Sequence, residues 1–280
     1  MYTHRITPAT IKPFLKPRAK NSHKGTFGHV FTIAGSKEKV GAALMSAYTA
    51  LKIGAGLSTL ILPDTAYKKI INPKKLELMY APVKKWNCVR VLSLLKNASV
   101  VALGPGLGTS PKTISFVHQL IQKYQGPLVI DADGLNALAK NPALLQKRKK
   151  RITLLTPHPA EMGRLIGHKT SFVQKNRIQV AHTFAKKWGV TLLLKGYRSV
   201  VAMPNGQVWI NPTGNPAMAS AGQGDVLTGI YAGLMAQFPD NPNVFLFGCF
   251  LHGLVGDILA QKKRVVLATD IADNLHLGYS

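Results

Sequence analysis

The chain has 280 residues, 46% of them hydrophobic, and its 36 Lys and Arg against 11 Asp and Glu give a formal net charge of +25. This length suits one large α/β domain or two small ones, with a core that needs no stapling by disulfides or zinc. No segment reaches the roughly 18 apolar residues of a membrane span, and the first residues lack the apolar region of a secretory signal. We therefore expect a cytoplasmic protein without a membrane segment, with residues 1–280 as one domain and residues 1–22 as a basic N-terminal extension.

The positive charge favours an anionic partner, either a nucleic acid or a phosphorylated metabolite. Basic runs occur at Lys12–Lys24 and Lys147–Arg151, but most of the excess is scattered, and the runs lack the interleaved aromatic residues of base-stacking surfaces. We interpret the excess mainly as a solvated surface, so nucleic-acid binding is the less favoured interpretation. Cys88 and Cys249 are far apart and outside any metal-ligand spacing, which predicts reduced thiols and no structural zinc.

Strand and helix patterns alternate along most of the chain. In chain order, the patterns predict a strand at His29–Ala34, a helix at Val40–Ile53, a strand at Leu57–Leu62, a helix at Asp64–Ile71, a strand at Ser99–Leu103, a helix at Ser110–Lys123, strands at Leu128–Ile130 and Ile152–Leu155, a helix at Phe172–Trp188, a strand at Val190–Leu194, a hairpin of Ser199–Met203 and Gln207–Ile210, and helices at Asp225–Gln237, Asn243–Gln261 and near Thr269–Leu277. Continuous apolar strands that alternate with helices predict an α/β fold with a mainly parallel central sheet, helices on both faces and a late antiparallel hairpin.

Loops with chemical content follow the predicted strands. They are Gly35-Ser36, Gly104–Gly108, Asp131–Asn136, Thr156–Pro159 and Lys195-Gly196, and the loop Asn211–Asp225 follows the hairpin. Ligands of open parallel sheets bind at the carboxyl ends of the strands. We therefore expect these loops to converge on a single active site.

The stretch Asn211–Gly229 carries the most specific signal. Its glycine-rich end, Gly222-Gln223-Gly224, precedes a helical pattern that begins at Asp225. Unpaired amides at such a helix start form an anion site, and an adjacent carboxylate can accept a proton from a hydroxyl that attacks a bound phosphate. The alternative is that Asp225 only caps the helix and the glycines only relieve crowding.

The other loops allow two interpretations each. Gly104–Gly108 can approach a ligand closely or serve as a plain turn. Asp131 and Asp133, near Asn136, can hold Mg²⁺ or position a hydroxyl, or they can serve as turn residues with Asp133 as a helix cap. His158 lies between two prolines, which fix its backbone, so we interpret it as a ligand contact rather than as a core residue; when neutral, it can donate a hydrogen bond to a phosphate or amide. Lys195 suits a nucleotide, or it is an exposed lysine at a strand end.

Other catalytic motifs are missing from the sequence. There is no Gly-x-Ser-x-Gly, no Walker A motif and no Gly-x-Gly-x-x-Gly after the first strand. The phosphate-binding function therefore falls to Gly222–Asp225.

The motifs, taken together, resemble those of a known family. His23–Gly28, Ala34–Ser36 and Gly41–Leu44 come first, and the loops at the strand ends and Asn211–Gly229 follow in the order of that family. The chain is similar to the ADP-dependent NAD(P)H-hydrate dehydratases of the ribokinase-like superfamily, from about His23 to the last long helix. The resemblance implies a ribokinase-like three-layer sandwich.

The resemblance also implies a repair reaction. The family uses ADP, or ATP in eukaryotic relatives, to phosphorylate the ring hydroxyl of the S-form of NADH or NADPH hydrate. Elimination of phosphate then restores NAD(P)H and leaves AMP and phosphate as the other products. Mg²⁺ would bridge the nucleotide phosphates, although the sequence assigns no metal ligand.

The same resemblance assigns site residues by motif match. Asp225 would be the catalytic base, and Ala42, Gly106, His158 and Asp225 would contact the hydrate. The nucleotide would contact Lys195, Gly196, Tyr197, Arg198, Ser199, Gly222, Gln223 and Gly224. Asp133, Asn136 and Asn215 would support the site.

The chain departs from the family pattern in two respects. Ala221 and Gln223 stand where many relatives have Gly and Thr, but the backbone donors are unaffected, so we expect function to survive. Many relatives also carry an N-terminal epimerase domain, which implies a separate epimerase as functional partner here. The family is commonly tetrameric, so a homotetramer is expected.

Two alternative functions belong to other classes. A small-molecule kinase of the same superfamily, of the hydroxyethylthiazole kinase type, would share Gly222–Asp225 but should lack Thr156–Glu161 and Asn211–Pro216. A basic nucleic-acid-binding protein is the other alternative. The sequence leaves open the choice between NADH and NADPH hydrate and between ADP and ATP.

Overall fold

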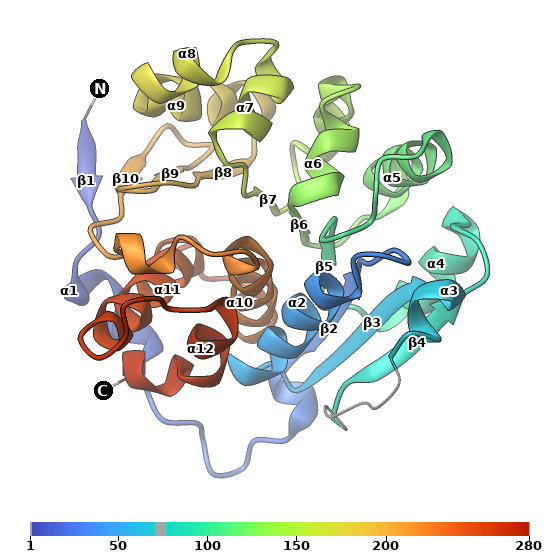
Figure 1. Ribbon diagram of the computed structural model, residues 1–280, viewed down its shortest axis with the longest axis horizontal. Coiled ribbons are helices and arrows are strands. Elements are labelled where there is room, and N and C mark those ends of the chain that lie inside the picture. The colour runs from blue at the N-terminus through green and yellow to red at the C-terminus, as the bar shows by residue number, and fades with distance from the viewer. Residues whose placement is uncertain (1, 71–76, 280) are drawn as a thin grey trace.

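The protein is seen in a computed structural model, which describes residues 2–70 and 77–279. The described strands form one ten-stranded sheet in the order β1-β10-β9-β8-β7-β6-β5-β2-β3-β4, with helices on both faces (Figure 1). The strands are β1 (Thr3–Arg5), β2 (His29–Ile33), β3 (Leu57–Pro63), β4 (Met79–Val83), β5 (Val100–Leu103), β6 (Leu128–Ile130), β7 (Thr153–Leu155), β8 (Thr191–Leu194), β9 (Val200–Ala202) and β10 (Val208–Ile210). The helices are α1 (Pro8–Ile11), α2 (Val40–Lys52), α3 (Asp64–Tyr67), α4 (Cys88–Leu94), α5 (Pro111–Lys123), α6 (Ala132–Leu138), α7 (Pro159–Ile166), α8 (Thr170–Lys175), α9 (Arg177–Trp188), α10 (Gln223–Gln237), α11 (Val244–Ala260) and α12 (Ala268–Asp273).

The predicted fold class is confirmed. The adjacent strands from β4 to β8 pair in parallel, and β9 runs antiparallel to both β8 and β10. Strands β5 and β6 are apolar at every position, as expected for strands covered on both faces. In β6, Leu128 and Ile130 pack into one core, and Val129 packs into the other.

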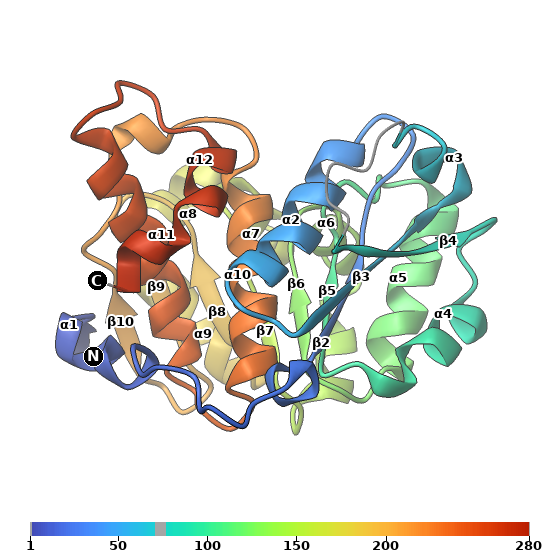
Figure 2. The same cartoon turned by 90° about the horizontal axis from the view of Figure 1, so that it is seen from below.

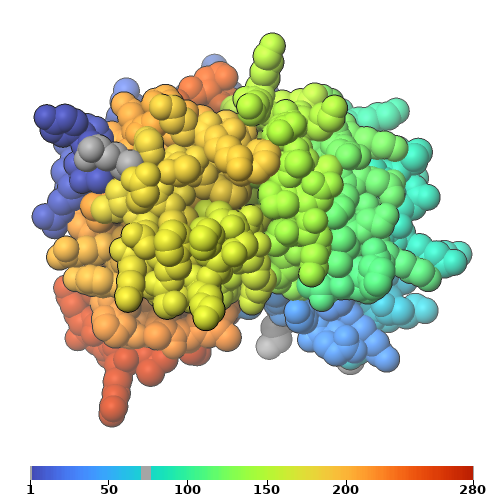
Figure 3. All heavy atoms as spheres, turned by 90° about the horizontal axis from the view of Figure 1, so that it is seen from above, coloured from blue at the N-terminus to red at the C-terminus, as the bar shows by residue number. Residues whose placement is uncertain are grey.

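Two helical layers enclose the sheet. One core includes residues of α4, α5, α6, α7 and α9, and the other includes residues of α2, α10, α11 and α12. Figure 2 shows the layer with α2, α10 and α11, and Figure 3 shows α7–α9 in yellow next to α5 and α6 in green on the opposite side. Among the described residues, no helix is both long enough and apolar enough to cross a membrane.

Helix α10 carries the predicted phosphate site at its N-terminus, and its position is tightly restricted. A Cβ at Gly229 would lie 2.3 Å from the Ser46 carbonyl oxygen, and one at Gly233 would lie 2.2 Å from Ile53 Cγ2. The two glycines therefore allow α10 to approach α2 closely. Residues from Val226 to Ala236 are all buried, so the helix is enclosed on every side and its start is held in place.

The N-terminal residues pack onto the fold, although the sequence predicted no element before His29. Strand β1 pairs with β10 at the edge of the sheet. Ile6, Ile11 and Phe14 are buried, and the Phe14 ring stacks on Phe247 at a centroid distance of 4.8 Å. These contacts join residues far apart in the sequence, so local periodicity could not reveal them.

Several element predictions were wrong in detail. The predicted helix Phe172–Trp188 is two helices, α8 and α9, which are separated at Asn176. Helices α6 and α7 begin directly after their strand-end residues, where the sequence predicted loops, and β4 and α4 were not predicted. The C-terminal helix ends at Asp273 and is followed by a 3-10 turn. The last residue of the predicted helix Asp64–Ile71 lies outside the described residues.

Candidate active site

The loops that follow five parallel strands meet at the same edge of the sheet. The Gly35 amide donates to the Pro105 carbonyl at 2.8 Å, and the Lys195 amide donates to the Pro157 carbonyl at 2.9 Å. The Gly108 amide donates to Asp133 Oδ2 at 2.8 Å. Lys195 Nζ also lies 2.8 Å from Asp131 Oδ1, which joins the loops after β6 and β8. The loops after β2, β5, β6, β7 and β8 therefore converge at one edge, as predicted.

The N-terminus of α10 is open toward this edge. Gly222, with φ +89°, is the N-cap, and the first intrahelical bond runs from the Val226 amide to the Gly222 carbonyl at 3.0 Å. The amides of Gln223, Gly224 and Asp225 precede that bond, so they point out of the helix end as potential anion donors. The helix begins at Gln223, two residues earlier than predicted.

Asp225 lies in the first turn of α10 and does not cap it. Its backbone carbonyl accepts a hydrogen bond from Ser46 Oγ at 2.8 Å. Its half-buried carboxylate forms no hydrogen bond or ion pair with any residue that the structure describes. Burial, reinforced by the nearby Asp131 carboxylate, raises the pKa of Asp225 to about 6, against the opposing charge of Lys195. A carboxylate with this pKa suits a general base near neutral pH.

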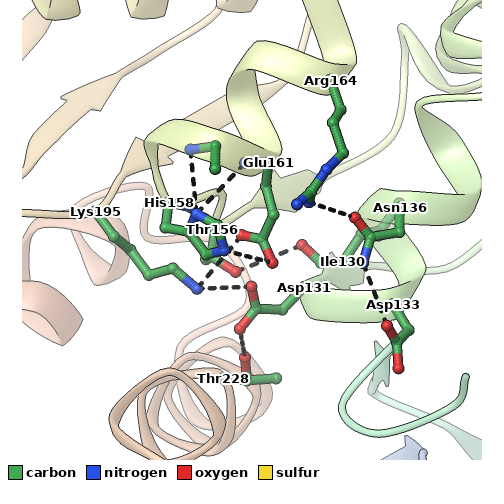
Figure 4. Close-up of polar contacts among 11 residues, drawn as sticks. Ile130, Asp131, Asp133, Asn136, Thr156, His158, Glu161, Arg164, Lys195 and Thr228 are labelled. Atoms are coloured by element: carbon green, nitrogen blue, oxygen red, sulfur yellow. Dashed lines mark hydrogen bonds and ion pairs between the residues drawn. The ribbon is translucent and has the colours of Figure 1, made fainter. Parts of the chain in front are cut away.

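Lys195 is paired and largely buried, so it is not an exposed lysine at a strand end. Its Nζ lies 2.8 Å from Asp131 Oδ1 and 4.0 Å from Glu161 Oε2 (Figure 4). Burial by itself would lower the pKa of Lys195, but the Asp131 and Glu161 carboxylates outweigh it and raise that pKa. A Cβ at Gly224 would lie 3.2 Å from Nζ. The ammonium therefore stays charged next to the first turn of α10.

A cavity of about 400 Å³ opens beside this helix end. It is lined by Lys195, Gly196, Tyr197, Arg198, Ser199, Gln223 and Gly224, seven of the eight residues predicted to bind a nucleotide, and also by Asn215. Gly222, the eighth, is not among the lining residues and forms the N-cap of α10. The Gln223 side chain donates to Ser220 Oγ at 3.2 Å and to the Val266 carbonyl at 2.9 Å, so it also braces the loop.

Two residues that the sequence did not single out hold the walls of this cavity. The Arg177 guanidinium donates to the carbonyls of Tyr197 at 2.7 Å and Leu194 at 3.1 Å. Asp257 accepts from the Gly214 amide at 3.0 Å and from Asn215 Nδ2 at 2.7 Å. Both come from long helices, α9 and α11. Arg177 is one of several basic residues of α9, whereas Asp257 is the one charged residue of α11, an apolar context that could have marked it.

The loop after β5 packs against the start of α2, the helix whose Ser46 hydroxyl contacts the Asp225 backbone. A Cβ at Gly106 would lie 2.7 Å from the Lys39 carbonyl oxygen and 3.4 Å from Ala42 Cβ, so Gly106 and Ala42 are neighbours. Asp133 supports this side, accepting from Lys39 Nζ at 3.0 Å and from Asn136 Nδ2 at 3.2 Å. Asp133 is therefore not the cap of α6, whose N-cap is Asp131.

His158 is the N-cap of α7. Its Nδ1 accepts from the Ala160 amide at 3.2 Å and the Glu161 amide at 3.4 Å, and its Nε2 lies 3.4 Å from Glu161 Oε1. Burial, followed by the charges of Lys195 and Arg164, lowers the pKa of His158. The ring is therefore neutral at pH 7 with its proton on Nε2, which can donate to a ligand.

A pair of substitutions separates the two possible roles of His158. His158→Ala should cost about 1 kcal/mol of stability because the cap is lost. His158→Asn keeps a capping oxygen, so stability should be retained. If Nε2 contacts the hydrate, both variants should raise the KM for hydrate with little change in the KM for ADP, measured alongside thermal unfolding. If the KM for hydrate rises in His158→Ala but stays normal in His158→Asn, His158 serves only as a helix cap.

The two acids after β6, Asp131 and Asp133, both pair with lysines. No group of three or more His, Cys, Asp or Glu side chains within residues 2–70 and 77–279 could hold a metal ion. Asp131 is bound to Lys195, and Asp133 is bound to Lys39 and Gly108.

Comparison with known proteins decides the family. A family model described as NAD(P)H-hydrate dehydratase matches residues 30–277. The chain belongs to the NAD(P)H-hydrate dehydratase family. Its fold is ribokinase-like, as in its structural neighbours.

Individual members of the family match almost the whole chain. A bifunctional NAD(P)H-hydrate repair enzyme from Moorella thermoacetica is 40% identical over 96% of this chain and 52% of its own length. An ADP-dependent (S)-NAD(P)H-hydrate dehydratase from Listeria monocytogenes is 33% identical over 97% of this chain and 94% of its own length. The crystal structure of the ADP/ATP-dependent NAD(P)H-hydrate dehydratase from Bacillus subtilis, obtained with ATP and Mg²⁺, matches with a TM-score of 0.86 and 28% identity, covering 100% of this chain and 98% of that one. The chain thus spans about half the length of the bifunctional relatives and almost all of the Listeria relative.

Proposed function

We propose that this chain is a hydro-lyase that uses ADP to dehydrate the S-form of NADH or NADPH hydrate back to NAD(P)H. One observation carries the proposal: the Asp225 carboxylate, which pairs with no other residue of the described chain, lies in the first turn of a helix whose N-terminal amides border a cavity of nucleotide size. The family membership and the name of the Listeria relative support the substrate and the nucleotide.

The proposed reaction has two steps. Asp225 accepts the proton of the ring hydroxyl as its oxygen attacks the terminal phosphorus of ADP, so an O–P bond forms, the bond to the leaving phosphate oxygen breaks, and AMP departs. The C–O bond to the transferred phosphate then breaks, the neighbouring ring carbon loses a proton, and NAD(P)H and phosphate are the products. The pKa of about 6 leaves Asp225 ionised, and able to accept the proton, at neutral pH.

We assign the two ligands to two groups of residues, as the resemblance to the family implies. The nucleotide occupies the cavity lined by Lys195–Ser199, Gln223 and Gly224, with the transferred phosphate at the α10 amides. The hydrate lies on the side of Ala42, Gly106 and His158. Gly222 shapes the helix start, while Asp133, Asn136 and Asn215 hold the surrounding loops.

The metal and the choice of nucleotide belong to the same proposal. We infer that Mg²⁺ arrives bound to the nucleotide phosphates and neutralises part of their charge. ADP is the preferred phosphoryl donor because the Listeria relative is named for it, whereas the Bacillus enzyme is named for ADP and ATP together.

We further propose a cytoplasmic homotetramer that works with an NAD(P)H-hydrate epimerase. The bifunctional names of several relatives support the pairing with a second repair activity. Light scattering coupled to size-exclusion chromatography tests the assembly directly: a mass near four chains supports a tetramer, and a single-chain mass refutes it.

The decisive experiment mixes the protein with NADH hydrate, Mg²⁺ and ADP and follows recovery of the dihydronicotinamide absorbance. We expect recovery that depends on ADP, with stoichiometric release of AMP and inorganic phosphate, and none without nucleotide. A stable phosphorylated product without phosphate release would instead indicate a small-molecule kinase. DNA binding that weakens steeply with salt, in a protein with no turnover, would support the nucleic-acid alternative.

A further inference from the structure

Asp131 is a buried acid at the centre of the site to which the proposed reaction assigns no role. It is 1% exposed and follows β6. Its Oδ1 lies 2.8 Å from Lys195 Nζ, at the end of β8, and its Oδ2 accepts from Thr228 Oγ1, on α10, at 2.8 Å. Asp131 therefore joins three separate elements through one carboxylate (Figure 4).

The backbone around Asp131 is shaped to keep it there. The Asp131 amide donates to the Leu103 carbonyl at 3.0 Å, and the Asp131 carbonyl accepts from the Gly134 amide at 2.9 Å. The next residue, Ala132, has φ +49°, a left-handed conformation that is strained for an alanine. Such strain persists only when the surrounding structure enforces it, and it clusters at functional sites.

This arrangement sets the position of the Lys195 ammonium. With its partner in place, the Lys195 ammonium lies at the first turn of α10, where the absence of a Cβ at Gly224 leaves room for it. An ammonium without a partner is costly to bury, and the next carboxylate, Glu161, is 4.0 Å away. Without Asp131, this cost would favour a side-chain conformation of Lys195 that exposes the ammonium to solvent.

We propose that Asp131 is a positioning residue: it holds the Lys195 ammonium beside the free amides of α10, so that both act on the phosphate of the bound nucleotide. The inference rests on the proposed function, which places that phosphate at the helix end. Asp131 acts through Lys195 and need not touch the nucleotide itself.

A double-mutant cycle tests this coupling. The variants are Asp131→Asn, Lys195→Met and the double variant, with ADP affinity measured by calorimetry and turnover measured with NADH hydrate. Each single change should weaken ADP binding about tenfold, as expected for loss of a hydrogen bond to a charged group. Each should also lower kcat by about 100-fold, the cost of a misplaced catalytic group. The KM for hydrate should stay unchanged, which a general structural defect would not produce.

The double variant decides the outcome. If Asp131 acts through Lys195, the double variant should match Lys195→Met in both ADP affinity and kcat. It should also be at least as stable as Asp131→Asn, because the unpaired buried ammonium is gone. This comparison holds even if Asp131→Asn fails to fold, since it needs only the double variant and Lys195→Met. Further loss in the double variant would overturn the inference.

Two controls test other routes by which Asp131 could act. One is its hydrogen bond to Thr228 on α10, and the other is a contact with Mg²⁺. Thr228→Val removes the second hydrogen bond of Asp131 but keeps its charge next to Lys195, so ADP affinity should fall far less than in Asp131→Asn. Recovery of Asp131→Asn at high Mg²⁺ would show that Asp131 acts on the metal, and the inference would be wrong. If the unaltered protein neither binds ADP nor turns over hydrate, the proposed function itself is wrong. If the unaltered protein is active but the losses of the two single variants add in the double variant, only the inference about Asp131 is wrong.

Discussion

Asp225→Asn is expected to lower turnover of NADH hydrate by about 100- to 10,000-fold, the usual contribution of a general base. The amide preserves the shape of the side chain but cannot accept the proton of the attacking hydroxyl. ADP affinity should be nearly unchanged, because the helix amides and Lys195 remain. Steady-state kinetics and calorimetry with ADP measure the two effects separately.

The matched control is Asp273→Asn, an aspartate on α12 that pairs with Lys52 away from the site. It should leave turnover as it is. A variant at Asp225 with near-normal turnover would remove this residue from the role of base.

The pH dependence offers a second test of the same base. Because Asp225 must be ionised to accept a proton, and burial raises its pKa to about 6, activity should be full at pH 7–8 and fall as the pH drops through about 6. His158 could also titrate on the acid side. His158→Asn should therefore keep the acid limb if Asp225 causes it. If the fall in activity at low pH disappears in His158→Asn, the titrating group is the His158 imidazole.

Gly104→Ala should be the most destabilising single change at the site. Gly104 has φ +132°, and a Cβ there would lie 1.8 Å from the Asp131 carbonyl oxygen. The methyl group cannot fit without moving the backbone of Asp131. Backbone strain and overpacking together predict a loss of roughly 3–5 kcal/mol in the free energy of unfolding, measured by urea denaturation.

Gly108→Ala separates the clash from the strain. Gly108 has φ +78°, but nothing lies within 4 Å of a Cβ built on it. Only the cost of the left-handed conformation should appear, about 1–2 kcal/mol. Equal losses in the two variants would show that backbone strain alone, without the contact to Asp131, explains the need for glycine at position 104.

Local patterns were sufficient for much of the fold and for the location of the candidate site. Apolar strands that alternate with amphipathic helices indicate a parallel sheet, because each strand needs both faces covered. Strand-end loops must then converge, and a glycine-rich loop before a helix predicts an anion site. The same logic failed for α6 and α7. The residues after Asp131 and around His158 have a composition typical of loops, so the sequence predicted loops there. In the structure α6 begins directly after Asp131, and α7 begins directly after His158.

The sequence by itself determined the class of the fold, the edge of the sheet where the loops of the candidate site meet and the glycine-rich start of α10, because these depend on periodicity and on glycine within short windows. Only the tertiary structure decided which charges pair. Asp131 and Lys195 are 64 residues apart, and Asn215 and Asp257 are 42 residues apart. Such pairs form because the order of strands in the sheet and the packing of α10 and α11 bring their elements together, and no local pattern encodes that order. The pairing of Asp131 with the Lys195 ammonium could therefore be recognised only in the folded structure.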